Sequence, residues 1–457
     1  MEVNNPLGTA PVGELIRKFA LPSMLSLLVS AAYNITDQIF IGHMVGMLGN
    51  AATNVSFPVV SLCTALAQLI GVGTAANFNI CQGRKDSENA KRYIGTGLVM
   101  SVILGVLLGI LILVFKTPIL VMCGATEQVL PYAQLYLGIT ALGLPFLLFS
   151  NCNSILVRAD GSPKWSMTCM VTGALINVFL DWFFMSVFSL GIQGAALATI
   201  ISQIISFGLC LSYFFRFRSF KIERSMLSVR IEHLKAIAKL GVSNFINHIV
   251  MMTVNIVLNN TLKHYGALSI YGSDIPLAVA GIVSKIYMIM VAFTVGLSQG
   301  CQPIFSFNMG AKNYDRVKET YIKAVKIAAV IGIVAFVIFQ TFPRQVTSIF
   351  GNGDVLYFEF AAQYLKTYLF CVFLTGIQPL TVNYFTSVGN VKSGIILSLS
   401  RQGLFLLPLI LVLPTILGLD GVLYAGPIAE VMAFIWSMSM MKREFKRLEV
   451  LKNSLHE

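Results

Sequence analysis

Long apolar stretches alternate with short polar segments along the whole chain, and twelve of them can be separated. Most are 20 or more residues long, which is what a helix rising about 1.5 Å per residue needs to cross a hydrocarbon layer about 30 Å thick. The pattern therefore predicts membrane-spanning helices. The predicted spans are residues 15–41, 50–80, 92–115, 129–157, 164–188, 191–215, 236–262, 276–307, 318–342, 356–386, 393–415 and 420–441.

The six stretches of the first half recur in the second half at an offset of 221 to 228 residues. Gly83-Arg84-Lys85-Asp86 after the second span matches Gly310-Ala311-Lys312-Asn313 after the eighth, for example. Such duplication is typical of transporters. We predict an all-α integral membrane protein built from two pseudo-symmetric six-helix bundles. The predicted parts are an N-terminal lobe (1–215), a cytoplasmic linker (216–235) and a C-terminal lobe (236–457).

Composition excludes a water-soluble protein. The chain is 56% hydrophobic and 11% charged, with a mean hydropathy of +0.78, which is too apolar for a soluble core of this length. No GxxxxGK[ST] loop is present, and the eight cysteines lie singly, without a CxxC pair. We therefore expect no enzyme activity, no cofactor and no structural metal. Transport would draw on an ion gradient or be passive.

The basic residues predict the orientation, because cytoplasmic loops retain positive charge during insertion. Of the 32 Lys and Arg, 27 fall on the side that holds both termini, four fall on the other side, and Lys285 lies within a span. Both termini are therefore predicted to be cytoplasmic. A polybasic loop beside anionic lipid also accounts for the net charge of +12 without nucleic acid as a partner.

Ionisable residues inside spans carry the most functional information, because each is costly unless it is buried in protein or faces water. Asp37, Asp181 and Thr199 each lie 17 to 19 residues from the basic residue that marks the cytoplasmic end of their span. That spacing corresponds to about 25 to 29 Å along a helix. Three helices therefore place polar side chains at a common depth in the outer half of the membrane.

Further polar residues share the helical faces of these three positions. They are Tyr33 and Asn34 beside Asp37, Asn177 beside Asp181, and Gln203 beside Thr199. Carboxylates, amides and hydroxyls are the ligands of hard cations, and two close carboxylates in a low dielectric retain a proton near neutral pH. We predict a cation or proton site here. The alternative is that Asp37 and Asp181 only cap helix ends near the outer interface.

A second cluster of charged residues is predicted in the C-terminal half, formed by Lys285, Arg401 and Glu430. Arg401 and Glu430 lie about 14 and 18 Å from the cytoplasmic markers of their spans, which is close enough in depth to pair. An unpaired arginine at this depth would be costly, so we expect an ion pair. A structural pair and a role in coupling both remain open.

Several motifs, taken in order, resemble the bacterial multidrug and toxic compound extrusion (MATE) family. The motifs are Pro6-Leu7-Gly8, Tyr33-Asn34-Ile35-Thr36-Asp37, Gly83-Arg84-Lys85, Arg158-Ala159-Asp160-Gly161, Asn177-Val178-Phe179-Leu180-Asp181 and Gly191-Ile192-Gln193-Gly194-Ala195-Ala196. Each motif is weak alone, but the combination is specific, and the resemblance covers essentially the whole chain.

The resemblance implies a V-shaped pair of six-helix bundles in the inner membrane, acting as a monomer among membrane lipids. It implies export of cationic or amphiphilic drug-like compounds in exchange for Na+ or H+. The DinF-type branch of the family binds the cation in the N-terminal lobe, and the matching positions are Asp37, Asn177, Asp181 and Thr199.

Other members use acidic residues in spans seven and ten, where this chain offers Asn255, Asn259 and no central acid. A C-terminal cation site is therefore not expected. The nearest rival function is a flippase or exporter of a lipid-linked or metabolite substrate, which related folds carry out with a wide basic cavity and extra spans. A passive channel or receptor would need a continuous polar stripe or an added soluble domain, and neither is visible in the sequence.

Overall fold

The computed structural model describes residues 5–272, 274–348 and 355–454, and within them the chain is helical with no β-strand. In this part of the chain eleven helices are long and apolar enough to cross a membrane. A further pair, Val355–Tyr368 and Val372–Ser387, is bent by 43° and brings the number to twelve if it forms one span. The predicted all-α, twelve-span fold class is confirmed.

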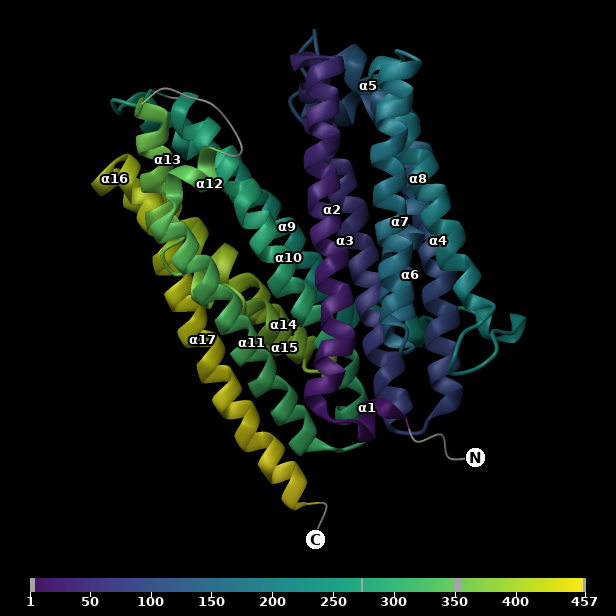
Figure 1. The fold of residues 1–457 in the computed structure, drawn as a ribbon. Coiled ribbons are helices and arrows are strands. Elements are labelled where there is room, and N and C mark those ends of the chain that lie inside the picture. The colour runs from purple at the N-terminus through teal and green to yellow at the C-terminus, as the bar shows by residue number, and fades with distance from the viewer. Residues whose placement is uncertain (1–4, 273, 349–354, 455–457) are drawn as a thin grey trace. The chain divides into compact units, whose positions relative to one another are not determined.

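The helices pack into two compact units, which are described separately (Figure 1). The N-terminal unit is Leu21–Phe245, and the C-terminal unit is Met1–Ala20 together with Ile246–Glu457. These units are defined by contacts in space, whereas the predicted boundaries at 215 and 236 follow the repeat in the sequence. The two divisions therefore differ. The predicted lobes and linker remain a prediction about the repeat.

The N-terminal unit contains most of α2 and the helices that follow it as far as the start of α9. Their bounds are α2 (Val12–Met44), α3 (Met47–Gly83), α4 (Ser87–Met122), α5 (Leu130–Thr140), the 3-10 turn η1 (Ala141–Gly143), α6 (Leu144–Ala159), α7 (Pro163–Trp182), the π-helix η2 (Phe183–Val187), α8 (Gly191–Phe214) and the 3-10 turn η3 (Arg224–Leu227). The predicted fourth span is thus α5, η1 and α6 in succession.

The C-terminal unit contains α1 (Pro6–Thr9), the start of α2, and the helices from the body of α9 onwards. Their bounds are α9 (Ile231–Ala267), α10 (Asp274–Gly310), α11 (Tyr314–Thr341), α12 (Pro343–Ser348), α13 (Val355–Tyr368), the 3-10 turn η4 (Val372–Leu374), α14 (Ile377–Ser387), α15 (Val391–Leu399), the π-helix η5 (Ser400–Leu406), α16 (Leu407–Leu417) and α17 (Leu419–Asn453).

Two helices, α2 and α9, begin in one unit and continue in the other. The start of the chain is held in the C-terminal unit, where Asn308 Nδ2 donates a hydrogen bond to the carbonyl of Leu7 at 2.9 Å. The start of α9 is held in the N-terminal unit, where a Cβ on Gly73 would lie 2.1 Å from the carbonyl oxygen of Ile237. Only glycine permits this approach of α9 to α3.

The duplication is visible in backbone conformation as well as in sequence. Lys85 and Lys312 both adopt positive φ, of 61° and 59°, in the turns that follow α3 and α10. Gly161 and Gly389 form a second matched pair, with φ of 81° and 84°. Positive φ is uncommon for a residue other than glycine, so its recurrence at matching lysines shows that the two halves repeat one design.

A polar cap marks the start of α4. There the Asp86 carboxylate accepts two hydrogen bonds from Asn89. One comes from the backbone N–H of Asn89 at 3.2 Å and the other from the side-chain amide of Asn89 at 2.7 Å. These two bonds hold the pKa of Asp86 below its ordinary value, because they favour the charged form. The cap belongs to the loop after α3, which is predicted to be cytoplasmic.

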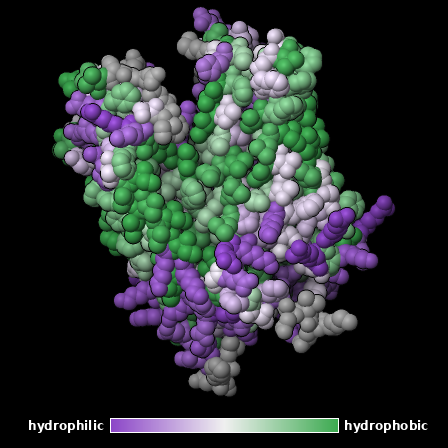
Figure 2. Space-filling model, viewed as in Figure 1, coloured by the Kyte–Doolittle hydropathy of each residue, from purple (hydrophilic) through white to green (hydrophobic). Residues whose placement is uncertain are grey.

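Exposed apolar side chains cover the outside of the spans. On α4, Leu107, Ile110 and Val114 are 55%, 55% and 67% exposed. Figure 2 shows broad hydrophobic areas on the visible surface, with hydrophilic residues gathered elsewhere. Apolar areas of this extent are not tolerated in water, which agrees with helices that face lipid.

Candidate functional site

The structure brings the predicted acidic residues together inside the N-terminal unit. Asp37 lies on α2, Asn177 and Asp181 lie on α7, and Thr199 lies on α8. Asp181 is fully buried and Asn177 is 2% exposed. The carboxyl groups of Asp37 and Asp181 are close enough to interact directly. The residues Asp37, Asn177, Asp181 and Thr199 are called the acidic cluster below.

Several oxygen atoms in this cluster and on the nearby Gln203 lack hydrogen-bond donors among the described residues. This holds for Oδ1 of Asp37, both carboxylate oxygens of Asp181, and the amide oxygens of Asn177 and Gln203. Most buried polar atoms in proteins are hydrogen-bonded, so a concentration of unsatisfied acceptors needs an explanation. A proton shared between the carboxyls or a small cation would satisfy them, because both supply what the acceptors lack.

A small cavity of about 90 Å³ lies beside the cluster. Tyr33, Asn177, Thr199 and Gln203 contribute to its wall, so four of the predicted site residues surround one polar space. The wall also contains several hydroxyl and amide side chains from α2, α6, α7 and α8. They are Ser30, Ser150, Asn151, Ser202 and Ser206. A cavity of this volume has room for several water molecules next to Asn177 and Thr199.

The donor set fits a proton or a monovalent cation better than a transition metal. No group of three or more His, Cys, Asp or Glu residues in the described part of the chain could hold a metal ion. Two carboxylates with amide and hydroxyl oxygens are hard ligands, and such ligands suit Na+ or a proton. If Na+ binds here, the oxygens of Asp37, Asp181 and Asn177 are the ligands that the cluster supplies.

Tyr136, on α5, belongs to the site but was not predicted as a site residue. Its ring is 8% exposed, its hydroxyl hydrogen-bonds with the side chain of Thr199, and it interacts electrostatically with Asp37. In the sequence Tyr136 appears only as a landmark that opens the fourth span. A tyrosine among apolar residues gives no signal of its own, because its partners come from other helices.

Asn34 reaches the site only through its chain neighbour Tyr33, with which its side chain interacts. Its side chain is exposed, and its amide donates to the carbonyl of Ser30 at 2.7 Å, within its own helix. The spacing of three residues from Asp37 puts Asn34 on a neighbouring face of α2, but not on the buried one. Tyr33, four residues from Asp37, lines the cavity.

The geometry of the two aspartates does not fit the helix-cap alternative. Asp37 lies within α2, seven residues before its end at Met44, and Asp181 lies one residue before the end of α7. A capping carboxylate is favourable at a helix N-terminus, where backbone N–H groups are free. The π-helix η2 follows Asp181 directly, and short π-helical segments are frequent at functional sites.

The predicted ion pair is present in the C-terminal unit. Arg401 Nε lies 2.9 Å from Glu430 Oε1, and the two side chains are 12% and 11% exposed. Arg401 also donates a hydrogen bond to the Tyr287 hydroxyl, and its guanidinium lies 5.8 Å from the centre of the Tyr287 ring. Thr375 adds a hydrogen bond to Glu430. The pair is therefore enclosed by partners from α10, η4–α14, η5 and α17.

Lys285 does not join this pair. It lies on α10, two residues before Tyr287, and is half-buried. None of the ion pairs found among the described residues includes it. The predicted cluster of three thus consists of one close ion pair and a separate lysine.

A family model described as MatE matches residues 22–183 and 245–412 of the chain. The multidrug export protein MepA of Staphylococcus aureus (strain N315) is 27% identical over 455 residues, which is 98% of this chain and 97% of MepA. The protein of the same name from Staphylococcus haemolyticus (strain JCSC1435) is also 27% identical, over 96% of this chain and 95% of its own length.

Solved structures of similar proteins share the fold. The MATE multidrug transporter DinF-BH is 31% identical with a TM-score of 0.88, over 95% of this chain and 96% of its own. An outward-facing MATE family transporter of the MOP superfamily has a TM-score of 0.90 at 24% identity, over 97% of this chain and 98% of its own. The second comparison supports the fold alone.

Proposed function

Because the chain belongs to the MATE family, we propose that it is a secondary active efflux transporter that exports cationic or amphiphilic drug-like compounds in exchange for Na+ or H+. The family model spans both halves of the chain. The relatives named as multidrug export proteins align over nearly the whole length. The solved structure at 31% identity is that of a multidrug transporter, which supports the proposed substrate class.

The single observation that carries ion coupling is the acidic cluster. Asp37 and Asp181 interact inside the protein, and the oxygen atoms that are buried there have no donors in the described structure. Two charged carboxylates in a medium of low dielectric repel each other and lose their hydration. Binding of a proton or Na+ removes that cost. Binding therefore changes the local free energy substantially, and this change can be linked to a conformational change.

In the proposed cycle, the coupling ion and the substrate favour different conformations. An ion that binds one conformation more tightly shifts the population towards it, and linkage requires that it weakens binding of a ligand that prefers the other. Asp37 and Asp181 would accept the proton or cation. Asn177, Thr199 and Tyr136 would position it through amide and hydroxyl oxygens.

We further propose that the protein works as a monomer in the plasma (inner) membrane with both termini in the cytoplasm. The distribution of Lys and Arg supports this orientation, since 27 of 32 lie on the side of the termini. Membrane lipids and small-molecule substrates are the proposed partners. The proposal requires no cofactor other than the coupling ion and assigns no enzyme activity to the chain.

Reconstitution tests the proposal directly. Purified protein is placed in liposomes, and uptake of a fluorescent lipophilic cation is followed under an imposed Na+ gradient, an imposed pH gradient, or neither. Uptake that depends on one gradient identifies the coupling ion. Liposomes with the Asp37→Asn variant serve as the matched control. Uptake at one rate in all three conditions would refute ion coupling, and movement of a labelled lipid-linked precursor in place of the cation would favour a flippase.

A further inference from the structure

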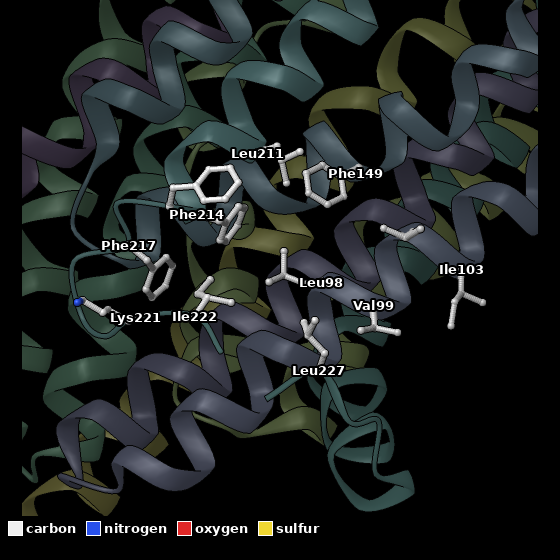
Figure 3. A pocket seen from close by; sticks show the side chains of 12 residues that line it. Leu98, Val99, Ile103, Phe149, Leu211, Phe214, Phe217, Lys221, Ile222 and Leu227 are labelled. Atoms are coloured by element: carbon white, nitrogen blue, oxygen red, sulfur yellow. The ribbon is translucent and has the colours of Figure 1, made fainter. Parts of the chain in front are cut away.

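An apolar pocket of about 610 Å³ lies in the N-terminal unit, away from the acidic cluster. Side chains of α4, α6 and α8 form its floor, and residues 215–227 fold back over them. Eleven of its twelve lining residues are apolar, and Lys221 is the exception. Figure 3 shows Lys221 at one end of the group, with its amino nitrogen at the edge, and Ile103 at the other end.

The segment that covers the pocket is fixed in place by specific contacts. The carboxylate of Asp160 accepts hydrogen bonds from the backbone N–H groups of Arg218 and Ser219, at 2.7 and 3.1 Å. Tyr213 and the Ser219 hydroxyl donate to the same carboxylate. This part of the predicted linker is therefore anchored to the end of α6. A preformed pocket binds a ligand at a lower entropic cost than one that must be ordered first.

A second anchor lies further along the same segment. Met226 is 5% exposed, and its carbonyl packs so closely on α4 that a Cβ on Gly95 would lie 1.8 Å away. Between the two anchors, Ile222 contributes to the wall of the pocket. The pocket also reaches the lipid-facing surface, because Val102 and Ile103 are 46% and 43% exposed.

The charge at the pocket selects the kind of ligand. Lys221 is exposed, and no ion pair among the described residues includes it. From Arg216 to Arg230 the chain carries five basic residues and one acid, Glu223. A cationic substrate would be repelled here, whereas an anionic headgroup would be attracted. The pocket therefore does not suit the cationic compounds that we propose the protein exports.

We propose that this pocket binds one acyl chain of an anionic phospholipid, with the headgroup phosphate at Lys221 and the chain running towards Ile103. Leu98 and Ile103 are five residues apart on α4, so the chain would run about 7 to 8 Å deeper into the span between them. The predicted cytoplasmic side of residues 216–235 places the headgroup at the inner leaflet, which carries anionic lipid. Burial of each methylene group of the acyl chain adds to the binding free energy.

Binding of defined lipids to the purified full-length protein tests the proposal. Delipidated protein is titrated with phosphatidylglycerol or with phosphatidylcholine of the same acyl chains, and bound lipid is counted by native mass spectrometry. We expect preferential binding of phosphatidylglycerol. Lys221→Ala should weaken it roughly fivefold, the effect of one basic residue near an anionic lipid. Val102→Trp, which fills the pocket, should weaken binding of both lipids.

Two matched variants separate the pocket from general effects. Arg224→Ala removes a cation from the same segment that does not line the pocket, and Val106→Trp adds the same bulk one turn further along α4. Both should bind phosphatidylglycerol like the wild type. Equal losses in Lys221→Ala and Arg224→Ala would overturn the proposal in favour of a diffuse basic surface. Unchanged binding in Val102→Trp, equal binding of the two phospholipids, or equally tight binding of a free fatty acid would also overturn it.

Discussion

The two units repeat one design but treat their buried acids in opposite ways. In the N-terminal unit, both carboxylate oxygens of Asp181 and one of Asp37 lack donors in the described structure. In the C-terminal unit, Glu430 lies 2.9 Å from Arg401, which also binds Tyr287. A carboxylate that is already paired with an arginine is stabilised little by a further cation. Two carboxylates without a counter-charge are stabilised much more. The difference supports our proposal that the N-terminal unit binds the coupling ion.

The repeat itself shows how the two units diverged. The offset between halves places Leu258 opposite Asp37 and Pro408 opposite Asp181, so the acids are not duplicated. Leu258 packs into the apolar core of the C-terminal unit. Both spans contain a π-helical segment but at different places in the repeat, since η2 (Phe183–Val187) follows Asp181 and η5 (Ser400–Leu406) ends before Pro408. The π-helical segment thus follows an acidic residue in one unit and contains Arg401 in the other.

Replacing Asp37 should have the largest effect on transport. Asp37→Asn keeps the volume of the side chain but cannot release a proton or neutralise a cation, so ion-coupled export should fall to background. Asp181→Asn should behave in the same way. The measurement is drug resistance in cells together with gradient-driven uptake in liposomes. Glu430→Gln provides the contrast, because the comparison predicts that its main effect is on stability.

The thermal midpoint of each variant distinguishes loss of function from loss of fold. Asp37→Asn should unfold at or above the wild-type midpoint, since the change removes a buried charge that lacks a partner. Resistance at the wild-type level in cells that express Asp37→Asn would remove this residue from the mechanism. It would also contradict the proposed difference between the ion-binding acids of the N-terminal unit and the paired acid of the C-terminal unit.

Breaking the ion pair of the C-terminal unit should have the largest effect on stability. Arg401→Ala leaves Glu430 buried without a counter-charge, which costs about 3 to 5 kcal/mol in comparable buried pairs. The double change Arg401→Ala with Glu430→Ala should cost less than this single change, because no lone charge remains. Denaturant or thermal unfolding of the three variants measures the coupling. Simple additivity of the two single changes would show that the residues do not act as a pair.

The fold was predictable because a membrane imposes strong rules on the chain. Span length, the alternation of polar loops and the repeated landmarks led to twelve spans, and the described structure agrees. The path of α2 and α9 between units was not predictable. It depends on close contacts such as Gly73 with the carbonyl of Ile237, and no sequence period reports which distant helix a glycine faces.

The positions of the cluster residues were predictable where depth and helical face decide them, whereas their role as an ion site stays a prediction. Asp37, Asp181 and Thr199 were placed at one level by counting residues from basic markers, and their helices meet in the structure. Asn34 shows the limit of this counting, because a step of three residues still leaves a side chain on the outer part of the helix. Tyr136 was missed because its role depends on a hydrogen bond to Thr199 on another helix.

The coupling ion should weaken substrate binding measurably. This effect should be smaller than the loss of export caused by Asp37→Asn. If the two favour different conformations, saturating Na+ or low pH should weaken binding of a lipophilic cation about 5- to 150-fold, the usual range of allosteric coupling. Fluorescence titration of the protein in detergent measures this affinity. The Asp37→Asn variant should lose the dependence. Substrate affinity that stays constant in the wild type across both titrations would contradict the exchange mechanism.

The smallest effect is expected at the hydroxyl groups that support the acidic cluster. Thr199→Ala removes a hydroxyl that hydrogen-bonds with Tyr136 and faces the polar cavity. One such hydrogen bond contributes about 0.5 to 1.5 kcal/mol, so the apparent affinity for the coupling ion should fall roughly two- to tenfold. Thr199→Ser keeps the hydroxyl and should restore most of that affinity, and Tyr136→Phe should give a loss similar to that of Thr199→Ala. Uptake rates measured against Na+ concentration or pH determine the affinity of each variant. If Thr199→Ser is as impaired as Thr199→Ala, the packing of the methyl group matters more than the hydroxyl. The coupling ion would then be bound by the two carboxylates without help from Thr199.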